Sequence, residues 1–85
     1  MSNYLITYDL NKTGQRYEEL YEAIKGYEYY KDMESVWFVK TSYSAEQIFE
    51  DLKKYIDEND RLFISEINDN RQGWLSQECW NFLES

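Results

Sequence analysis

The chain opens on a short apolar run that places bulky side chains on both faces of a strand. The run reads Tyr4-Leu5-Ile6-Thr7-Tyr8-Asp9-Leu10. Because successive strand residues point to opposite faces, it predicts a central strand that is covered on both sides. The apolar pattern breaks at Asp9, where we expect the strand to end. A carboxylate there is in a favoured position for a site, and equally in an ordinary position for a turn residue.

Two later stretches have the spacing of amphipathic helices. Four apolar residues of the first recur at i, i+3, i+4 and i+7: Tyr17, Leu20, Tyr21 and Ile24. Gly26 is expected to end this helix. The second opens at Ser44, where Gln47 three residues later completes the pattern of a capping box. Its buried face is predicted to consist of Ile48, Leu52, Tyr55 and Ile56.

Three more β-prone runs complete the pattern, at residues 27–33, 36–41 and 61–67. A short turn that includes Glu34 and Ser35 joins the first two of these runs, which predicts a hairpin. The resulting order is strand-helix-strand-strand-helix-strand, the ferredoxin-like α+β arrangement. We therefore expect a four-stranded antiparallel sheet with its first and third strands in the middle and both helices on one face.

The last residues are unusually apolar for a terminus. We expect one domain over residues 1–85, with a ferredoxin-like core at 3–68 and a tail at 69–85 in which Ser76 caps an extra C-terminal helix. Trp74 and Trp80 could anchor a partner protein, although packing on the same dimer is favoured. Because the strands are apolar on both faces, a second copy of the chain or the tail is expected to cover the sheet face without helices.

Composition excludes several kinds of chemistry. The net charge of −8, from 17 acidic and 9 basic residues, opposes broad, non-specific binding of nucleic acid. It is typical of a solvated acidic surface. The chain has no histidine, which removes Ser-His and Cys-His catalysis and most zinc sites. Its one cysteine, Cys79, excludes an internal disulfide and is expected to be a small buried residue. With no apolar leader or membrane-length run, we expect a cytoplasmic protein.

Two side-chain groups have both a structural and a functional interpretation. Aromatic residues on the predicted hairpin could stack on bases, although core or dimer-interface positions are favoured: Tyr27, Tyr29, Tyr30 and Trp37. Basic residues near the end of the second helix alternate with acidic ones, and we interpret all of them as solvated helix-exit charges: Lys53, Lys54, Asp57, Glu58, Asp60 and Arg61.

The opening run resembles the first strand of the Cas2 family, the small CRISPR-associated proteins of the adaptation machinery. In that family an apolar strand ends in Tyr-Asp followed by an apolar residue. Glu34-Ser35-Val36-Trp37-Phe38 resembles the family's third strand, and Arg61-Leu62-Phe63-Ile64 falls where its fourth strand should lie. The likeness covers residues 3–68 and is greatest to the stand-alone relatives that are often labelled SinR-like.

This resemblance implies a ferredoxin-like homodimer stacked through its sheets, with Asp9 close to its symmetry mate. In several members that aspartate pair is proposed to bind a divalent metal, Mg²⁺ or Mn²⁺, for phosphodiester cleavage, whereas other members are structural. The chain departs from the family in its acidic charge and in the arginine cluster expected directly after Asp9, which is reduced to Lys12 and Arg16. Its tail is also predicted to be helical, where the family has a swapped final strand.

Three functions stay open on the sequence alone. The first is a homodimeric interaction or regulatory module of a prokaryotic or phage defence-related or toxin–antitoxin type system. The second is a metal-dependent endoribonuclease or deoxyribonuclease with Asp9 as its catalytic and metal-binding residue. The third is an acidic mimic of nucleic acid that blocks a basic site on another protein. None of the three functions is expected to involve a membrane.

Overall fold

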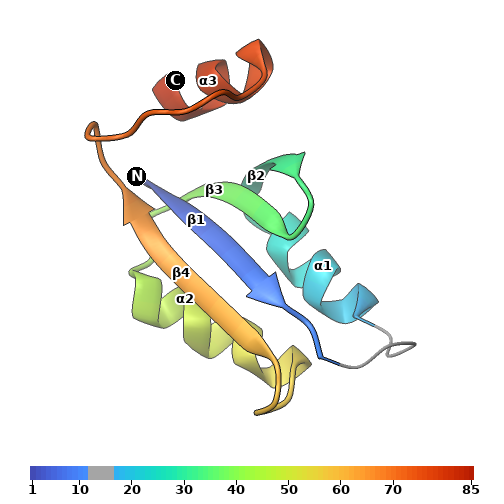
Figure 1. Cartoon of the computed structure of the whole chain (residues 1–85). Coiled ribbons are helices and arrows are strands. Elements are labelled where there is room, and N and C mark those ends of the chain that lie inside the picture. The colour runs from blue at the N-terminus through green and yellow to red at the C-terminus, as the bar shows by residue number, and fades with distance from the viewer. Residues whose placement is uncertain (12–16) are drawn as a thin grey trace.

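The computed structural model describes residues 1–11 and 17–85 of the chain. Its elements follow in the order β1 (Ser2–Asp9), α1 (Glu18–Lys25), β2 (Glu28–Met33), β3 (Val36–Thr41), α2 (Ala45–Leu52), the 3₁₀ turn η1 (Lys53–Tyr55), β4 (Arg61–Ile67) and α3 (Gln77–Glu84). The predicted ferredoxin-like α+β order with an extra C-terminal helix is confirmed (Figure 1).

The four strands form one antiparallel sheet in the order β2-β3-β1-β4. The first strand therefore lies between the third and the fourth, as the pattern of elements predicts. Leu5 is opposite Phe38 in β3 and opposite Ser65 in β4, which fixes the register. At the hairpin between β2 and β3, Ser35 has a positive φ of 58°, a conformation suited to a tight turn.

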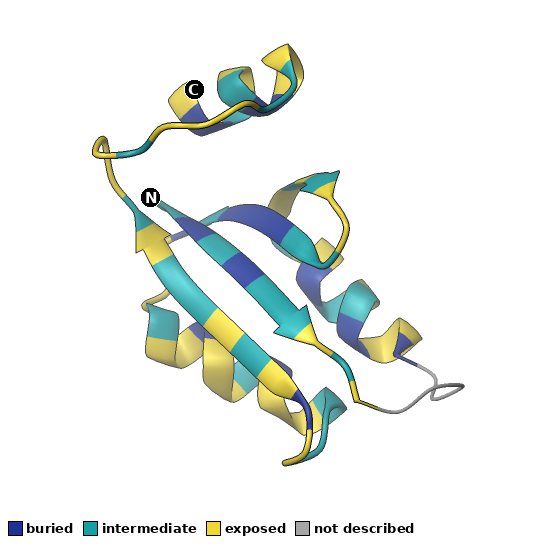
Figure 2. Cartoon of the chain, viewed as in Figure 1, coloured by how far each residue is buried: buried dark blue, intermediate teal, exposed yellow. Residues whose placement is uncertain are grey.

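One face of the sheet packs on α1 and α2, which lie on the same side (Figure 1). The core between these layers is formed by residues of β1, β3 and both helices: Tyr4, Ile6, Leu20, Ile24, Trp37, Val39, Ile48 and Leu52. Figure 2 shows the corresponding buried bands along the sheet and helices. The helical spacing of the apolar residues thus forms the expected buried stripe.

The helix ends follow local side-chain chemistry, with one difference. Ser44 caps α2 as predicted, because its Oγ accepts from the Gln47 N–H at 3.1 Å while Gln47 Oε1 accepts from the Ser44 N–H at 2.8 Å. The α-helix ends at Leu52. The predicted buried stripe continues through η1 to the residue after it, and Tyr55 and Ile56 are half-buried. A tighter last turn is a common way to satisfy the final carbonyl groups of a helix.

The opposite face of the sheet is covered at one end by α3. Its buried side chains Cys79 and Leu83 pack on Phe38, with several half-buried apolar residues around them: Leu5, Tyr30, Val36, Ile67, Leu75, Trp80 and Phe82. The tail thus docks on its own sheet, and its helical conformation agrees with the prediction from Ser76.

Polar contacts hold α3 in this position. Ser76 Oγ donates to Asp32 Oδ1 at 2.7 Å and accepts from the Cys79 N–H at 3.2 Å, so one serine both caps α3 and ties it to β2. At the other end of the helix, Asn3 Nδ2 donates to the Leu83 carbonyl at 2.8 Å. These contacts make the position of α3 specific, beyond what apolar packing alone would achieve.

We expect the Cys79 thiol to react slowly while the chain is folded. Burial raises the pKa of this thiol, and the nearby Asp32 carboxylate adds to the shift. The side chain is fully buried between α3 and the sheet. Because the thiolate is the reactive form, labelling by a chromogenic disulfide should be about 100-fold slower than in guanidinium. Rapid labelling of the native chain, with unchanged circular dichroism, would show that α3 undocks readily.

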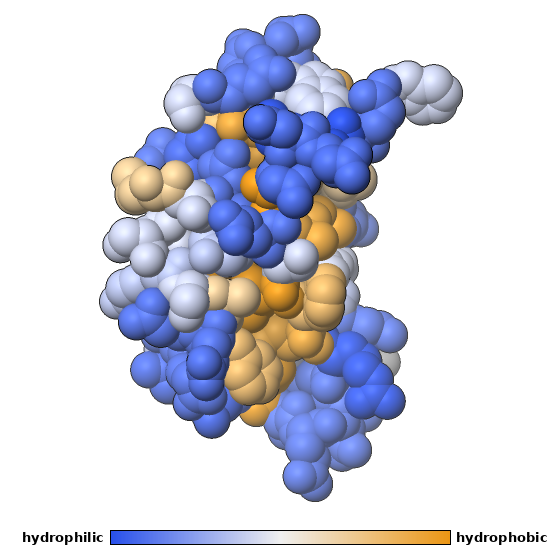
Figure 3. All heavy atoms as spheres, turned by 90° about the vertical axis from the view of Figure 1, so that its left-hand side faces the viewer, coloured by the Kyte–Doolittle hydropathy of each residue, from blue (hydrophilic) through white to orange (hydrophobic). Residues whose placement is uncertain are grey.

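The other end of this face is not covered by α3. Phe63 of β4 points to the same side as Leu5 and is 61% exposed. Figure 3 shows apolar side chains gathered along the side of the molecule on which β4 forms the edge of the sheet. We call Thr7, Asp9, Arg61 and Phe63, which share this end of the face, the uncovered end of the sheet.

Candidate functional site

Asp9 ends β1 on the uncovered end of the sheet, and its side chain is exposed. In the strand register it lies directly opposite Arg61 of β4. Two residues earlier, Thr7 lies opposite Phe63, and Thr7 Oγ1 donates to the Ser35 carbonyl at 2.8 Å. The position predicted for Asp9, at the accessible end of the central strand, is therefore the one observed.

Asp9 does not form a metal site within one chain. Among residues 1–11 and 17–85, no three His, Cys, Asp or Glu side chains form a group that could hold a metal ion. Mg²⁺ needs six oxygen ligands, and the strand neighbour of Asp9 is the cationic Arg61. Within the described residues, Asp9 could supply only part of such a coordination shell, and the rest would come from water or from other groups. The basic residues Lys12 and Arg16 lie outside the described part of the chain.

The carboxylate that the fold buries near this end is Asp60, which corrects its interpretation as a solvated helix-exit charge. Asp60 is 7% exposed. Its Oδ1 accepts from the Asn11 N–H at 2.7 Å and from Tyr17 Oη at 3.0 Å, and its Oδ2 accepts from the Asp57 N–H at 3.1 Å. One side chain thus ties together the segment after β1, the start of α1 and the loop before β4.

These hydrogen bonds also explain the titration of Asp60. The Asn11 N–H has the largest effect in lowering the pKa of this carboxyl, burial opposes it, and the Asp57 N–H and Tyr17 hydroxyl add to the lowering. Asp60 directly precedes Arg61, the strand neighbour of Asp9. It is therefore a positioning residue for the uncovered end of the sheet, and the sequence pattern does not reveal it.

The predicted hairpin aromatics divide between the two sheet faces. Tyr30 lies beneath α3, 6.0 Å from Phe82 between ring centroids. Trp37 is buried on the helix side, as the core interpretation predicts. Tyr27 Oη donates to Asp51 Oδ2 at 2.7 Å. Burial has the largest effect in raising the pKa of Tyr27, and this hydrogen bond adds to the rise. The fourth, Tyr29, is largely exposed beside Trp37.

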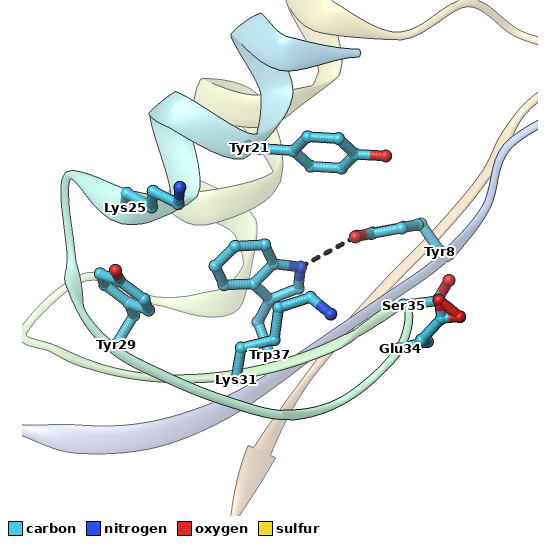
Figure 4. A pocket seen from close by; sticks show the side chains of 8 residues that line it. All are labelled: Tyr8, Tyr21, Lys25, Tyr29, Lys31, Glu34, Ser35 and Trp37. Atoms are coloured by element: carbon cyan, nitrogen blue, oxygen red, sulfur yellow. Dashed lines mark hydrogen bonds between the residues drawn. The ribbon is translucent and has the colours of Figure 1, made fainter. Parts of the chain in front are cut away.

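Beside Trp37, α1 and the hairpin border an open pocket of about 530 Å³, a volume within the range of small-molecule sites. Figure 4 shows aromatic rings around it from β1, α1, β2 and β3. They belong to Tyr8, Tyr21, Tyr29 and Trp37. Sequence reasoning identified Tyr29 and Trp37 as candidate stacking residues, but missed Tyr21, which has the spacing of a core position.

One hydrogen bond organises this pocket. Trp37 Nε1 donates to Tyr8 Oη at 2.9 Å, which satisfies the indole N–H away from water. Burial raises the pKa of Tyr8, the Trp37 hydrogen bond opposes the rise, and the nearby Tyr21 adds to it. Tyr8 therefore stays protonated at neutral pH, and its hydroxyl keeps a hydrogen that it can donate.

Comparison with known proteins gives one decisive match. A family model described as CRISPR associated protein Cas2 matches residues 1–73. The chain belongs to the Cas2 family. A search of curated proteins finds no match. The Cas2 match includes all four strands and both helices of the ferredoxin-like core, so the resemblance noted in the opening run is confirmed at the level of the family.

Family membership makes the protein a CRISPR-associated one, and Cas2 proteins are typically dimers. The relationship to SinR-labelled members stays a prediction. Helix α3 begins at Gln77, after the last residue that the Cas2 match includes. Helix α3, which covers one end of the sheet, therefore lies outside the segment that matches the Cas2 family model. No helix in the described part of this Cas2 chain is long and apolar enough to cross a membrane.

Proposed function

We propose that this Cas2-family chain is a homodimeric, non-catalytic interaction or regulatory module of a prokaryotic or phage defence-related or toxin–antitoxin type system. The observation that carries the proposal is Phe63, which is 61% exposed on the edge strand β4, at the uncovered end of the sheet. Exposing a large apolar side chain to water is unfavourable in free energy. Burial against a second copy of the chain would remove this apolar surface from water.

The position of α3 supports the same proposal. Because α3 is tied to β2 through Ser76 and Asp32 and to β1 through Asn3, it stays at its own end of the sheet. The uncovered end is thereby left to a second copy, related by a two-fold axis that passes near Phe63. The acidic charge of −8 suits a further partner with a cationic surface, such as a basic protein.

The mass of the native chain in solution tests the dimer. We expect sedimentation equilibrium to give twice the chain mass of 10.4 kDa at micromolar concentration. A monomer at all concentrations would contradict the proposal.

A second candidate function, metal-dependent cleavage of RNA or DNA, is favoured by the position of Asp9. Asp9 shares the uncovered end of the sheet with Phe63, so a dimer formed there brings two Asp9 carboxylates toward the two-fold axis. Two carboxylates and waters could hold one Mg²⁺ or Mn²⁺. Such an ion would activate a water and polarise a phosphoryl oxygen.

A cleavage assay on mixed RNA and DNA with Mg²⁺ or Mn²⁺ separates the two functions. The native chain is compared with Asp9→Ala and with Asp69→Ala, a control at another exposed aspartate. For the non-catalytic module we expect no cleavage by any of the three. Metal-dependent cleavage that Asp9→Ala lowers by about 100-fold or more, while Asp69→Ala keeps it, would establish the nuclease instead.

A further inference from the structure

The aromatic pocket beside Trp37 lies on the helix side of the sheet, the face opposite to the one that carries Asp9 and Phe63. Trp37 is 3% exposed and forms its floor. The Tyr21 ring is nearly parallel to the indole, at 23° and 6.3 Å between centroids, and the Tyr29 ring is tilted by 55° at 5.5 Å. These centroid distances are those of ordinary aromatic contacts, so the rings form one continuous aromatic wall of the pocket.

Two ammonium groups stand at the rim of the pocket. Lys31 Nζ is 5.5 Å from the centroid of the Trp37 ring and donates to the Met33 carbonyl at 3.2 Å. Lys25 Nζ is 3.8 Å from Glu22, whose side chain is 75% exposed, so solvent screens this ion pair. Neither lysine is held by a buried carboxylate, and each can turn its ammonium group toward an anion.

The charge of the pocket differs from that of the chain. Its lining includes Lys25 and Lys31 against one carboxylate, Glu34, whereas the whole chain has a net charge of −8. Cations gathered at an aromatic hollow on an acidic protein indicate a ligand that combines an aromatic ring with a negative charge.

A cationic ligand fits this arrangement less well. Aromatic rings with a nearby carboxylate can form a cage for a quaternary ammonium group. Here, however, Lys31 already lies over the Trp37 face, and Lys25 adds a second positive charge. A ligand cation would have to displace the Lys31 ammonium group from the Trp37 ring, and the Lys25 ammonium group would still repel it. Both effects disfavour binding.

We propose that this pocket binds a nucleoside monophosphate, either free or as one unit of a single strand. Its base stacks on the accessible faces of Tyr21 and Tyr29, beside the buried Trp37, as bases stack in single-strand binding sites. Its phosphate lies at the rim, between Lys25 and Lys31. The Tyr8 hydroxyl, oriented by the Trp37 indole, donates to an acceptor on the edge of the base.

The first test is a titration of the ¹⁵N-labelled full chain, followed through the indole N–H resonance of Trp37. We expect adenosine and uridine monophosphates to shift this resonance saturably. Adenosine without a phosphate should bind about tenfold more weakly, because charge-assisted contacts at the rim are lost. Inorganic phosphate alone should leave the indole unshifted. Tighter binding of choline than of either nucleotide, or no saturable shift, would overturn the proposal.

Surface variants test the roles within the pocket without disturbing buried Trp37. Lys25→Gln combined with Lys31→Gln should weaken nucleotide binding by about tenfold or more. Tyr21→Leu, which keeps an apolar side chain on α1, should weaken it by a similar factor because a stacking partner is lost.

Matched controls lie elsewhere on the chain. Lys53→Gln combined with Lys54→Gln makes the same charge change beyond the pocket, and Tyr43→Leu removes another partly exposed ring. These variants should bind nucleotide as the native chain does, and equal weakening in pocket and control variants would contradict the site. Short single-stranded oligonucleotides identify the source of the ligand, since tighter binding than that of the free nucleotide indicates a strand. None of these results depends on dimer formation.

Discussion

Replacing Asp60 with alanine should lower the free energy of unfolding by about 3 kcal/mol. The expected loss follows from the three hydrogen bonds that the carboxylate accepts, since bonds to charged groups contribute about 1.5–3 kcal/mol each and part is regained through solvation. The buried Tyr17 hydroxyl would also lose an acceptor. Urea denaturation followed by circular dichroism measures the change.

The exposed residue Asp69 provides the control. Asp69→Ala removes the same group from a solvated position and should change stability by less than about 0.5 kcal/mol. Equal stability of the Asp60 and Asp69 variants would show that the buried contacts add nothing to folding.

The lowered pKa of Asp60 gives its effect a definite pH dependence. A carboxyl whose pKa is lower in the folded chain contributes its full stability above its unfolded pKa of about 3.9. This contribution is lost as pH falls through the lowered folded value. Below about pH 4, stability should therefore fall more steeply with decreasing pH in the native chain than in Asp60→Asn. Parallel acid titrations would argue against a shifted Asp60.

Phe63→Glu should convert the proposed dimer into a monomer. Each dimer contains two copies of the substitution near the two-fold axis, so two apolar contacts are lost and two carboxylates face a desolvated interface. The dissociation constant should rise by about 100-fold or more. Because Phe63 is largely exposed in the single chain, the fold should be retained. Sedimentation equilibrium with circular dichroism measures both properties.

Phe49→Glu is the matched control for this substitution. Phe49 is also an exposed phenylalanine, at 40%, but it lies on α2, which packs on the opposite face of the sheet. Its variant should keep the mass of the native protein. Dimers that persist in Phe63→Glu, or that dissociate equally in both variants, would place the interface elsewhere.

Features that depend on neighbouring residues could be predicted from the sequence. The bounds of β4 and the caps at Ser44 and Ser76 follow from residue types within a few positions, and the structure has them as expected. Alternation in β1 also predicted its two apolar environments, with Ile6 on the helix side and Leu5 on the other. Such patterns are local, and packing preserves them.

Features that depend on distant residues could not be predicted in this way. Asp60 resembles Asp57 and Glu58 in sequence, and it is buried only because Asn11 and Tyr17, 49 and 43 positions away, bring donors to it. The aromatic pocket likewise needs α1 to lie beside the hairpin. Asp9 was placed correctly at the strand end, but the proposed shared metal site would depend on a second copy of the chain.

The central position of β1 has a consequence for synthesis of the protein. This strand leaves the ribosome before β4, yet β4 is one of its two neighbours, and Ile67 of β4 lies opposite Asn3. One edge of β1 therefore stays unpaired until most of the chain has been translated, and it can meanwhile pair with other nascent chains. Sequence-distant pairing of this kind also slows folding. Translation speed through β4 should consequently affect the yield of soluble protein.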